Sequence, residues 1–170
     1  MTDIRPLVTE DVQTLVRLAR QIWHNHYPGI ISPAQIDYML AQRYTTQSIC
    51  PSLASTHWLT AWKNGTMAGF AQGFACDHKT WQLDKLYVHP DCQHRGIGRA
   101  LFSRIHGLAE NNGAERLVLR VNRNNALALK AYTRFGFRIY AENVLEIGNG
   151  YVMDDYLMEL ALGAGVDCKI

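Results

Sequence analysis

The spacing of apolar residues predicts helices in the first third of the chain. Between residues 9 and 24 the apolar positions recur at intervals of three and four, which is typical of a helix that buries one face. Thr9 is expected to cap this helix, with acidic residues following in its first turn. The dipeptide Ser32-Pro33 predicts the start of a second helix, and "TTQSICPSL" predicts a further short helical turn.

From residue 57 the period changes to that of strands. "HWLTAWK", the turn "NG" and "MAGFAQGFAC" predict a hairpin, and "TWQLDKLYVHP" is a third strand that proline ends. A helix over residues 98–112, a buried strand "RLVLRV" and a helix over residues 125–136 follow. "FRIYAENVLEI" and "YVMDDYLMELAL" then predict a closing antiparallel pair. Because no repeat or linker interrupts these segments, residues 1–170 are expected to form one α+β domain around a mixed sheet.

The composition restricts the classes of function. The chain has 170 residues and a formal net charge of +2, so no global field would attract nucleic acid or an anionic membrane. No segment has the apolar core of a signal peptide or the roughly 18 consecutive apolar residues of a membrane span. The four cysteines lack C-x-x-C spacing and are expected to be reduced thiols. A cytoplasmic protein without nucleic-acid or membrane partners is therefore expected.

The stretch "QHRGIGRALF", from Gln93 to Phe102, places two glycines among basic side chains at a predicted helix N-terminus. The first N–H groups of a helix have no intrahelical partner, and glycines let an anion approach the backbone closely. Arg95 and Arg99 can add charge-assisted hydrogen bonds, with His94 as a weaker contributor. The segment is either a phosphate-binding loop or a glycine turn. It lacks the Lys-Ser or Lys-Thr of a P-loop and the third glycine of a dinucleotide-binding loop.

Two separate motifs resemble those of the GNAT superfamily of acyl-CoA-dependent N-acyltransferases. "LDKLYVHPDCQHRGIGRALF" is similar to its motif A, [Q/R]-x-x-G-x-[G/A] after a V-x-P strand end, with matches at Gln93, Gly96 and Gly98. "NALALKAYTRFGF" is similar to a second signature, N-x-x-A-x-x-x-Y-x-x-x-G-F. The resemblance covers nearly the whole chain. It implies a mixed, mostly antiparallel central sheet with a splayed parallel strand pair and flanking helices.

The same resemblance implies acetyl-CoA as the cosubstrate and assigns residues to it. The backbone of Leu86 and Val88, with Tyr87 between them, would pair with the pantetheine arm of CoA. The loop would hold the pyrophosphate through its backbone N–H groups. Its assigned residues are Gln93, His94, Arg95, Gly96, Ile97, Gly98 and Arg99. Asn125 either lies beside the cofactor arm or only caps its helix.

Two residues are candidates for proton transfer. By the resemblance, Tyr132 would donate a proton to the departing thiolate of CoA, and a phenol with a pKa of about 10 holds that proton at neutral pH. The alternative for Tyr132 is a packed core residue. Asp84 is the first candidate for the general base that deprotonates the amine, and the equal alternative is a bystander carboxylate that only pairs with Lys85 or Arg120.

The acceptor is expected to be a primary amine on a small molecule or a peptide, acetylated by direct transfer. "YPGIISPAQIDYMLAQRY" resembles a region of a GNAT subgroup that includes bacterial polyamine acetyltransferases. Nearby aromatic residues either accommodate an organic cation or pack as a lid; they are Trp23, Tyr27, Tyr38 and Tyr44. Asn122 could hold a water, and Asp154 and Asp155 could attract a cationic substrate.

Three alternatives complete the sequence-based expectations. His24-x-His26 has no recognisable second set of ligands, so no metal is expected. A catalytically silent sensor of acyl-CoA, or an interaction subunit, is the alternative to an enzyme. The long final strand could pair with a second copy of the chain, which leaves both a monomer and a homodimer open.

Overall fold

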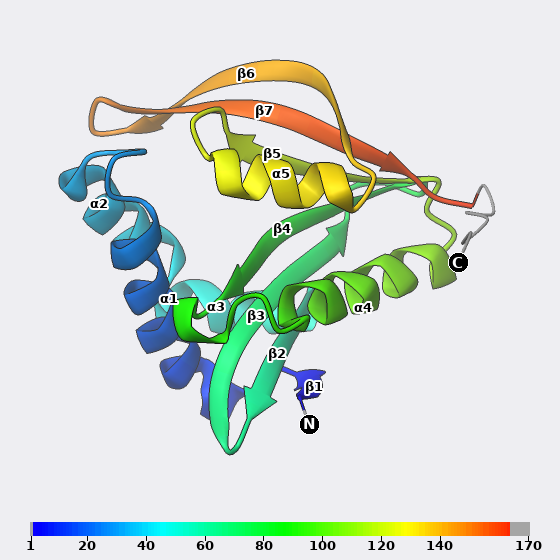
Figure 1. The fold of residues 1–170 in the computed structure, drawn as a ribbon, viewed down its shortest axis with the longest axis horizontal. Helices are drawn as coiled ribbons and strands as arrows, with labels where there is room; N and C mark the ends of the chain where they lie inside the picture. Colours follow the sequence, from blue (N-terminus) through cyan, green and yellow to red (C-terminus); the bar gives the residue numbers. More distant parts are fainter. Residues whose placement is uncertain (1, 164–170) are drawn as a thin grey trace. The chain divides into compact units, whose positions relative to one another are not determined.

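A computed structural model describes residues 2–163 of the chain, and Figure 1 shows its ribbon. The strands are β1 (Asp3–Pro6), β2 (His57–Lys63), β3 (Thr66–Ala75), β4 (Thr80–Val88), β5 (Arg116–Asn122), β6 (Arg138–Gly148) and β7 (Tyr151–Ala161). The α-helices are α1 (Val12–His26), α2 (Pro33–Arg43), α3 (Thr46–Ile49), α4 (Ile97–Asn111) and α5 (Ala126–Arg134). Three 3-10 turns are η1 (Thr9–Asp11), η2 (Cys50–Ala54) and η3 (Pro90–Cys92). Every helix and strand predicted from the periodicity is present, with small shifts at the ends.

The strands form one mixed sheet in the order β1-β2-β3-β4-β5-β7-β6. The pairs β1–β2, β2–β3, β5–β7 and β6–β7 are antiparallel, whereas β4 and β5 are parallel. The parallel register joins Thr80–Gln82 to Arg116–Val118, and both strands continue beyond it. The predicted α+β fold with a mostly antiparallel sheet and one parallel pair is therefore confirmed.

Contacts divide the chain into two compact units. The first comprises the chain up to Phe74 together with Leu83–Ile105. The second comprises Ala75–Gln82 together with the chain from His106 onward. The expectation of a single domain over residues 1–170 stays a prediction. Within residues 2–163, every helix is too short or too polar to cross a bilayer.

In the first unit, local capping signals explain where the helices begin. Ser32 caps α2 as predicted, because its Oγ accepts a hydrogen bond from the N–H of Gln35 at 3.2 Å. The prediction that Thr9 caps the first helix is wrong. Thr9 begins η1 instead, α1 starts three residues later, and the residue before η1 is Val8, which has no capping oxygen. The buried core of this unit includes Leu15, Ile22, Ile36, Met39, Leu40 and Phe70.

Strand β3 approaches β4 closely at Gly69. A Cβ at this position would lie 2.7 Å from the backbone oxygen of Tyr87 and 3.3 Å from the Cα of Val88. Such a distance is far inside van der Waals contact, so only glycine fits without a backbone shift. Gly69 therefore fixes the position of the β4 segment to which the sequence assigns the pantetheine arm.

In the second unit, β7 lies between β5 and β6 (Figure 1). Glu159 on β7 joins all three strands, since its carboxylate accepts a hydrogen bond from Arg138 on β6 at 2.7 Å and lies 3.6 Å from Arg116 on β5. Both edges of β7 are thus occupied, and the expectation that the final strand pairs with a second copy is wrong. A homodimer formed in another way stays a prediction.

Strand β6 ends the sheet and is open to solvent. None of its residues is buried, although it is 11 residues long. The hairpin that it forms with β7 carries five exposed large apolar side chains, namely Ile139, Tyr140, Val144, Leu145 and Val152.

Candidate functional site

The loop between β4 and α4 has the backbone of an anion-binding turn. His94 and Gly96 both have left-handed backbone, with φ of 57° and 79°. The carbonyl of Gly96 accepts the N–H of Ala100 at 2.9 Å, so α4 begins directly after Gly96. The N–H groups of the first helical turn have no partner within the helix, and the helix dipole places partial positive charge beside them. This arrangement suits a phosphate.

The two glycines of this loop leave space that the protein itself does not fill. A Cβ on Gly96 would meet no atom within 4 Å, and one on Gly98 would meet only Val88 Cγ2, at an ordinary 3.6 Å. Gly96 is explained by its positive φ, which side chains rarely adopt. Gly98 is explained neither by conformation nor by packing. Its missing side chain therefore favours access of a ligand to the backbone.

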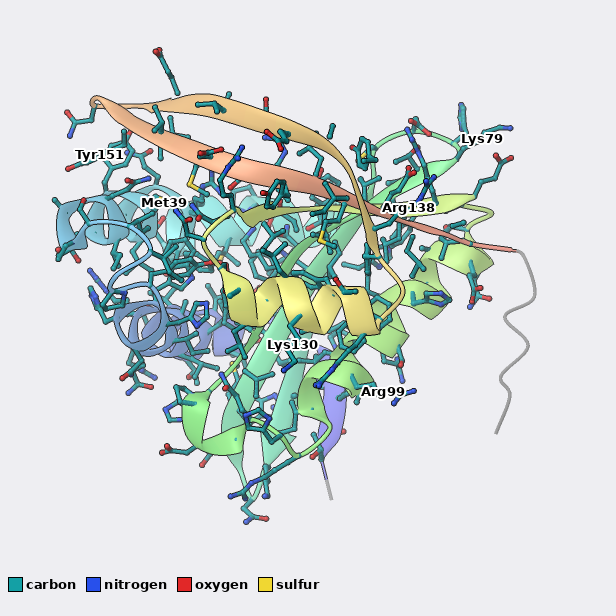
Figure 2. The ribbon with its side chains drawn as sticks, turned by 45° about the horizontal axis from the view of Figure 1, so that its top comes forward. Met39, Lys79, Arg99, Lys130, Arg138 and Tyr151 are labelled. Atoms are coloured by element: carbon teal, nitrogen blue, oxygen red, sulfur yellow. The ribbon has the colours of Figure 1, made fainter. Side chains whose placement is uncertain are left out.

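The basic and polar side chains of the loop have two roles: one holds the loop in place, and the others are available to an anion. Gln93 is structural, because its Nε2 donates a hydrogen bond to the carbonyl of Val88 at 3.2 Å and ties the loop to the end of β4. Arg95 and Arg99 are exposed, and within residues 2–163 neither forms an ion pair. Arg99 projects from the first turn of α4 (Figure 2). Both guanidinium groups are thus available to an anion.

The end of β4 combines partly exposed residues with a hydroxyl pair. Leu86, Tyr87 and Val88 are all half-buried. The hydroxyl of Tyr87 lies 3.0 Å from the hydroxyl of Tyr27 at the end of α1. The assignment of this backbone to the pantetheine arm stays a prediction.

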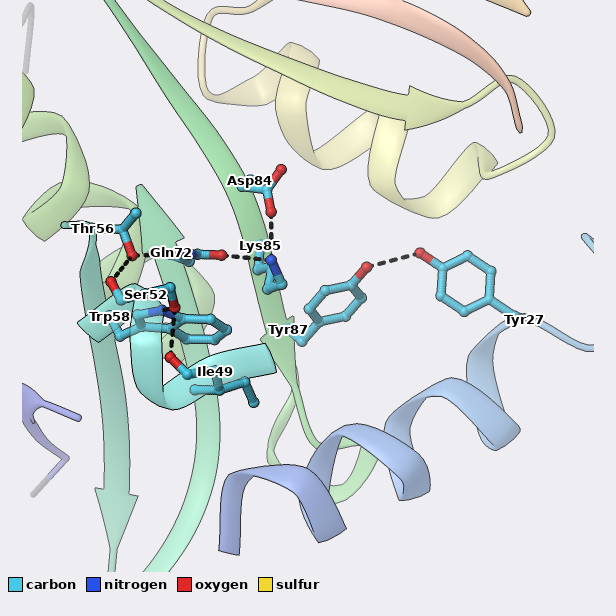
Figure 3. Close-up of polar contacts among 9 residues, drawn as sticks. All are labelled: Tyr27, Ile49, Ser52, Thr56, Trp58, Gln72, Asp84, Lys85 and Tyr87. Carbon is cyan, nitrogen blue, oxygen red and sulfur yellow. Dashed lines mark hydrogen bonds and ion pairs between the residues drawn. The ribbon is translucent and has the colours of Figure 1, made fainter. Parts of the chain in front are cut away.

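Asp84 has a partner, which the sequence offered as one of two alternatives. Its Oδ2 accepts a hydrogen bond from Lys85 Nζ at 2.5 Å, as Figure 3 shows. The Asp84 side chain keeps 30% of its surface exposed, whereas Lys85 keeps 12%. The pairing with Lys85 that the bystander alternative expected is therefore present. It does not decide whether Asp84 also acts as the general base, and that role stays a prediction.

The predicted aromatic cluster packs mostly against itself. Trp23, Tyr27 and Tyr44 are buried, and the Trp23 ring lies 4.4 Å from Tyr27 and 5.5 Å from Tyr44 between centroids. Burial raises the pKa of Tyr44 well above its ordinary value, and the nearby Tyr27 and Asp84 raise it further. Tyr44 is therefore a neutral phenol at physiological pH. Trp23, Tyr27 and Tyr44 therefore match the alternative in which the aromatic residues pack against the protein. Tyr38 lies on α2 and is half-buried.

In the second unit, Asn125 is a helix cap. Its side-chain oxygen accepts the N–H of Ala128 at 3.2 Å, and only 4% of the residue is exposed. The capping alternative is confirmed, and a role beside the cofactor stays a prediction. Tyr132 lies on α5, half-buried, with its ring edge-on to Phe137 at 5.9 Å between centroids. Its role as a proton donor also stays a prediction.

Asn122 at the end of β5 and Asp154 on β7 both have partners within the second unit. The Asn122 side-chain oxygen accepts the N–H of Asn124 at 2.9 Å, which closes a turn before α5. Asp154 is bound by Arg123 at 2.9 Å, so its charge is already compensated. Asp155 is 3% exposed. Turn formation explains the presence of Asn122, and ion pairing explains that of Asp154, so neither residue requires a substrate as its partner.

Two features escaped the sequence analysis. Lys85 was noted only as a partner for Asp84, and the buried Gln72 that also binds it was not singled out at all. Gly69 was read as an ordinary strand residue, although a glycine within a strand often marks close backbone approach. Among residues 2–163, no group of three His, Cys, Asp or Glu side chains could hold a metal ion.

A mixed sheet with one parallel pair and a glycine loop at a helix N-terminus fit an acyltransferase that binds a CoA thioester. The sequence model described as the acetyltransferase (GNAT) family matches residues 16–137. The chain belongs to this family.

Individual relatives agree with this assignment. The chain is 27% identical to the spermidine N(1)-acetyltransferase of Thermoplasma acidophilum over 143 residues, which cover 81% of this chain and 88% of the relative. It is 38% identical over 76 residues to the ribosomal protein bS18-alanine N-acetyltransferase of Escherichia coli K12, covering 44% of this chain and 50% of that protein.

Solved structures show the same likeness. The crystal structure of the PaiA N-acetyltransferase from Thermoplasma acidophilum in complex with coenzyme A has a TM-score of 0.82 and 25% identity, covering 95% of this chain and 99% of that one. A GCN5-related N-acetyltransferase from Rhodopseudomonas palustris has the same fold, with a TM-score of 0.82, 23% identity and coverage of 95% and 96%. The protein is an acetyl-CoA-dependent N-acetyltransferase, and acetyl-CoA is its cosubstrate.

Proposed function

We propose that the protein transfers the acetyl group directly from acetyl-CoA to a primary amine in a ternary complex. The observation that carries this proposal is the loop of residues 93–99, with left-handed backbone at His94 and Gly96 before a helix N-terminus. In the proposal these backbone N–H groups bind the pyrophosphate, and Arg95 and Arg99 add charge-assisted hydrogen bonds. The backbone of Leu86–Val88 pairs with the pantetheine arm.

The chemistry needs a proton acceptor and a proton donor. The neutral amine attacks the thioester carbonyl, a C–N bond forms, and the C–S bond breaks to release the thiolate of CoA. In the proposal Asp84 takes the proton that the amine loses, directly or through water, and Tyr132 supplies the proton that the thiolate gains. The cap at Asn125 and the edge-on contact with Phe137 support this role, because they fix α5 and the Tyr132 ring.

Two acceptor classes remain in the proposal, and each has its own support. A polyamine is favoured by the likeness to the spermidine N(1)-acetyltransferase, which extends over 81% of this chain. A peptide amine is favoured by the higher identity, 38%, to the alanine N-acetyltransferase, over 44% of the chain. Since the polyamine relative covers more of the chain, including the region before β2, we propose a polyamine as the first acceptor to test.

The proposed location is the cytoplasm. Among the described residues, Cys50, Cys76 and Cys92 are not joined in disulfides, which is compatible with the expected reducing compartment; Cys168 lies outside the described residues.

A thiol-release assay tests the proposed function. The purified chain is incubated with acetyl-CoA and, separately, spermidine, n-butylamine or a short peptide with an N-terminal alanine, and free CoA is measured. Release above the rate without amine is expected with at least one acceptor. Saturable binding of acetyl-CoA without release would favour the silent sensor, and a chain that neither binds nor releases would refute the proposal.

A further inference from the structure

The ammonium of Lys85 has four neighbouring residues within the first unit. Nζ lies 2.5 Å from the side-chain oxygen of Gln72 and 2.5 Å from Asp84 Oδ2. It also lies 5.0 Å from the ring centroid of Trp58 and 5.9 Å from that of Tyr44. Only 12% of the side chain is exposed. Removing an ammonium from water is unfavourable unless such partners compensate it, and the four neighbours of Lys85 provide this compensation.

The contact between Lys85 and Asp84 is unusual for neighbours on a strand. Successive side chains of a β-strand point to opposite faces, so residues 84 and 85 do not face each other by default. The Asp84 carboxylate nevertheless meets the ammonium of Lys85 (Figure 3). The charge of Lys85 therefore contributes to the orientation of the Asp84 carboxylate, which keeps 30% of its surface exposed.

A chain of hydrogen bonds anchors Lys85 itself. The Nε2 of Gln72 donates to Thr56 Oγ1 at 2.9 Å, and Thr56 Oγ1 donates to the carbonyl of Ser52 at 2.7 Å. Trp58, whose ring faces Lys85, donates its indole N–H to Ser52 Oγ at 2.8 Å. Gln72 is 5% exposed and Trp58 is 4% exposed. The ammonium is thus held by buried groups that are themselves tied to η2, and it presents a rigid positive charge to Asp84.

We propose that Lys85 is a positioning residue for acetyl transfer, acting by holding the Asp84 carboxylate in the orientation in which it receives the proton of the acceptor amine. The inference rests on the proposed function, in which Asp84 is that acceptor. In this proposal Lys85 itself does not touch the amine, the thioester or the departing thiolate. Its effect passes entirely through Asp84, and this gives the inference a distinctive test.

The test is a double-mutant cycle in kcat. Lys85→Met, Asp84→Asn and the double variant are compared with the unaltered chain, using spermidine, n-butylamine and the alanine peptide as acceptors. Lys85→Met is expected to lower kcat by about tenfold or more and to leave the Km for acetyl-CoA within about twofold. In the Asp84→Asn background, the same substitution is expected to have no further effect, because the group through which Lys85 acts has been removed. Lys85→Arg, which keeps the charge, is expected to restore part of the rate.

Lys79→Met is the matched control. It removes a lysine–carboxylate pair with Glu115, at 2.7 Å, in which both side chains are more than 60% exposed. Its kcat is expected to match that of the unaltered chain. All variants are first checked by thermal unfolding and acetyl-CoA titration, so that loss of folding is seen separately.

The outcomes separate the inference from the function on which it rests. An unaltered chain that releases no thiol refutes both. An active chain in which Asp84→Asn is fully active refutes the role of Asp84 and, with it, that of Lys85. Equal rate losses for Lys85→Met in the two backgrounds, or a Lys85→Met variant as fast as the unaltered chain, would overturn the positioning role alone.

Discussion

The space left open at Gly98 offers a direct test of the pyrophosphate loop. In a helix each Cα–Cβ bond tilts toward the N-terminus, so a side chain at Gly98 would lie over the first N–H groups of α4. A Cβ there is compatible with the fold, because it meets only Val88 Cγ2, at 3.6 Å, and the φ of Gly98 is not positive; thermal unfolding checks the rest of a leucine side chain. The leucine side chain would nevertheless occupy the place in which we expect the pyrophosphate. Gly98→Leu should therefore separate folding from cofactor binding.

The size of the effect follows from the hydrogen bonds at risk. A hydrogen bond between a backbone N–H and a charged phosphate contributes about 1.5–3 kcal/mol. Each 1.4 kcal/mol changes a dissociation constant about tenfold. Loss of one such bond should therefore weaken acetyl-CoA binding by about 10- to 100-fold, and loss of two by more.

Isothermal titration calorimetry of the purified chain with acetyl-CoA measures this change. Gly107→Leu is the matched control, since Gly107 lies on the same helix and a Cβ there meets no atom within 4 Å. Both variants gain a better helix former, and thermal unfolding should show both to be folded. An affinity in Gly98→Leu equal to that of the unaltered chain, or an equal loss in Gly107→Leu, would refute the reasoning.

Tyr132→Phe is expected to lower kcat by about 100- to 10,000-fold while the calorimetric affinity for acetyl-CoA stays unchanged, because only the phenolic proton is lost; an unchanged kcat would leave Tyr132 as a packing residue. Gly69→Ala is expected to destabilise the protein by about 1–3 kcal/mol in urea unfolding, because its Cβ would lie 2.7 Å from the backbone oxygen of Tyr87. An unchanged midpoint would contradict that close approach. The carboxyl of Asp77 accepts hydrogen bonds from the backbone N–H of Lys79 and from that of Thr80. These bonds, that of Lys79 most of all, lower its pKa below the ordinary 3.8. A carboxylate with a lowered pKa stabilises the fold above its unfolded pKa and loses that contribution as the pH falls through its folded value. Asp77→Asn should therefore have a lower Tm than the unaltered chain at pH 7, and the difference should shrink as the pH falls through the folded pKa of Asp77. A difference in Tm that does not shrink in acid would argue against this cause.

Caps and turns could be predicted because their signals are local. Ser32 and Asn125 each accept an N–H three residues ahead, and the spacing in the sequence is sufficient to foresee this. The loop around Gly96 was predictable for the same reason, since its glycines and basic residues lie directly before a predicted helix start. Thr9 shows the limit of local signals, because a 3-10 turn precedes α1 and moves its start past the expected cap.

The residues that escaped prediction depend on partners far away in the sequence. Lys85 is buried because Gln72 and Trp58 surround it, 13 and 27 positions earlier in the chain. Gly69 matters only because the backbone of Tyr87 lies against it. The position of β7 between β5 and β6 likewise depends on pairing with a strand that α5 separates from the hairpin. Period and composition carry no information about such pairings.

The position of β6 at the end of the sheet has a consequence for hydrogen exchange. Every second amide of this strand points away from β7 and has no strand to protect it, whereas the amides of β7 are bonded on both sides. Because β6 also buries no side chain, little apolar area resists its detachment. Deuterium should therefore enter residues 138–148 long before residues 151–161, and the earliest protease cuts in the second unit should fall on this outer strand.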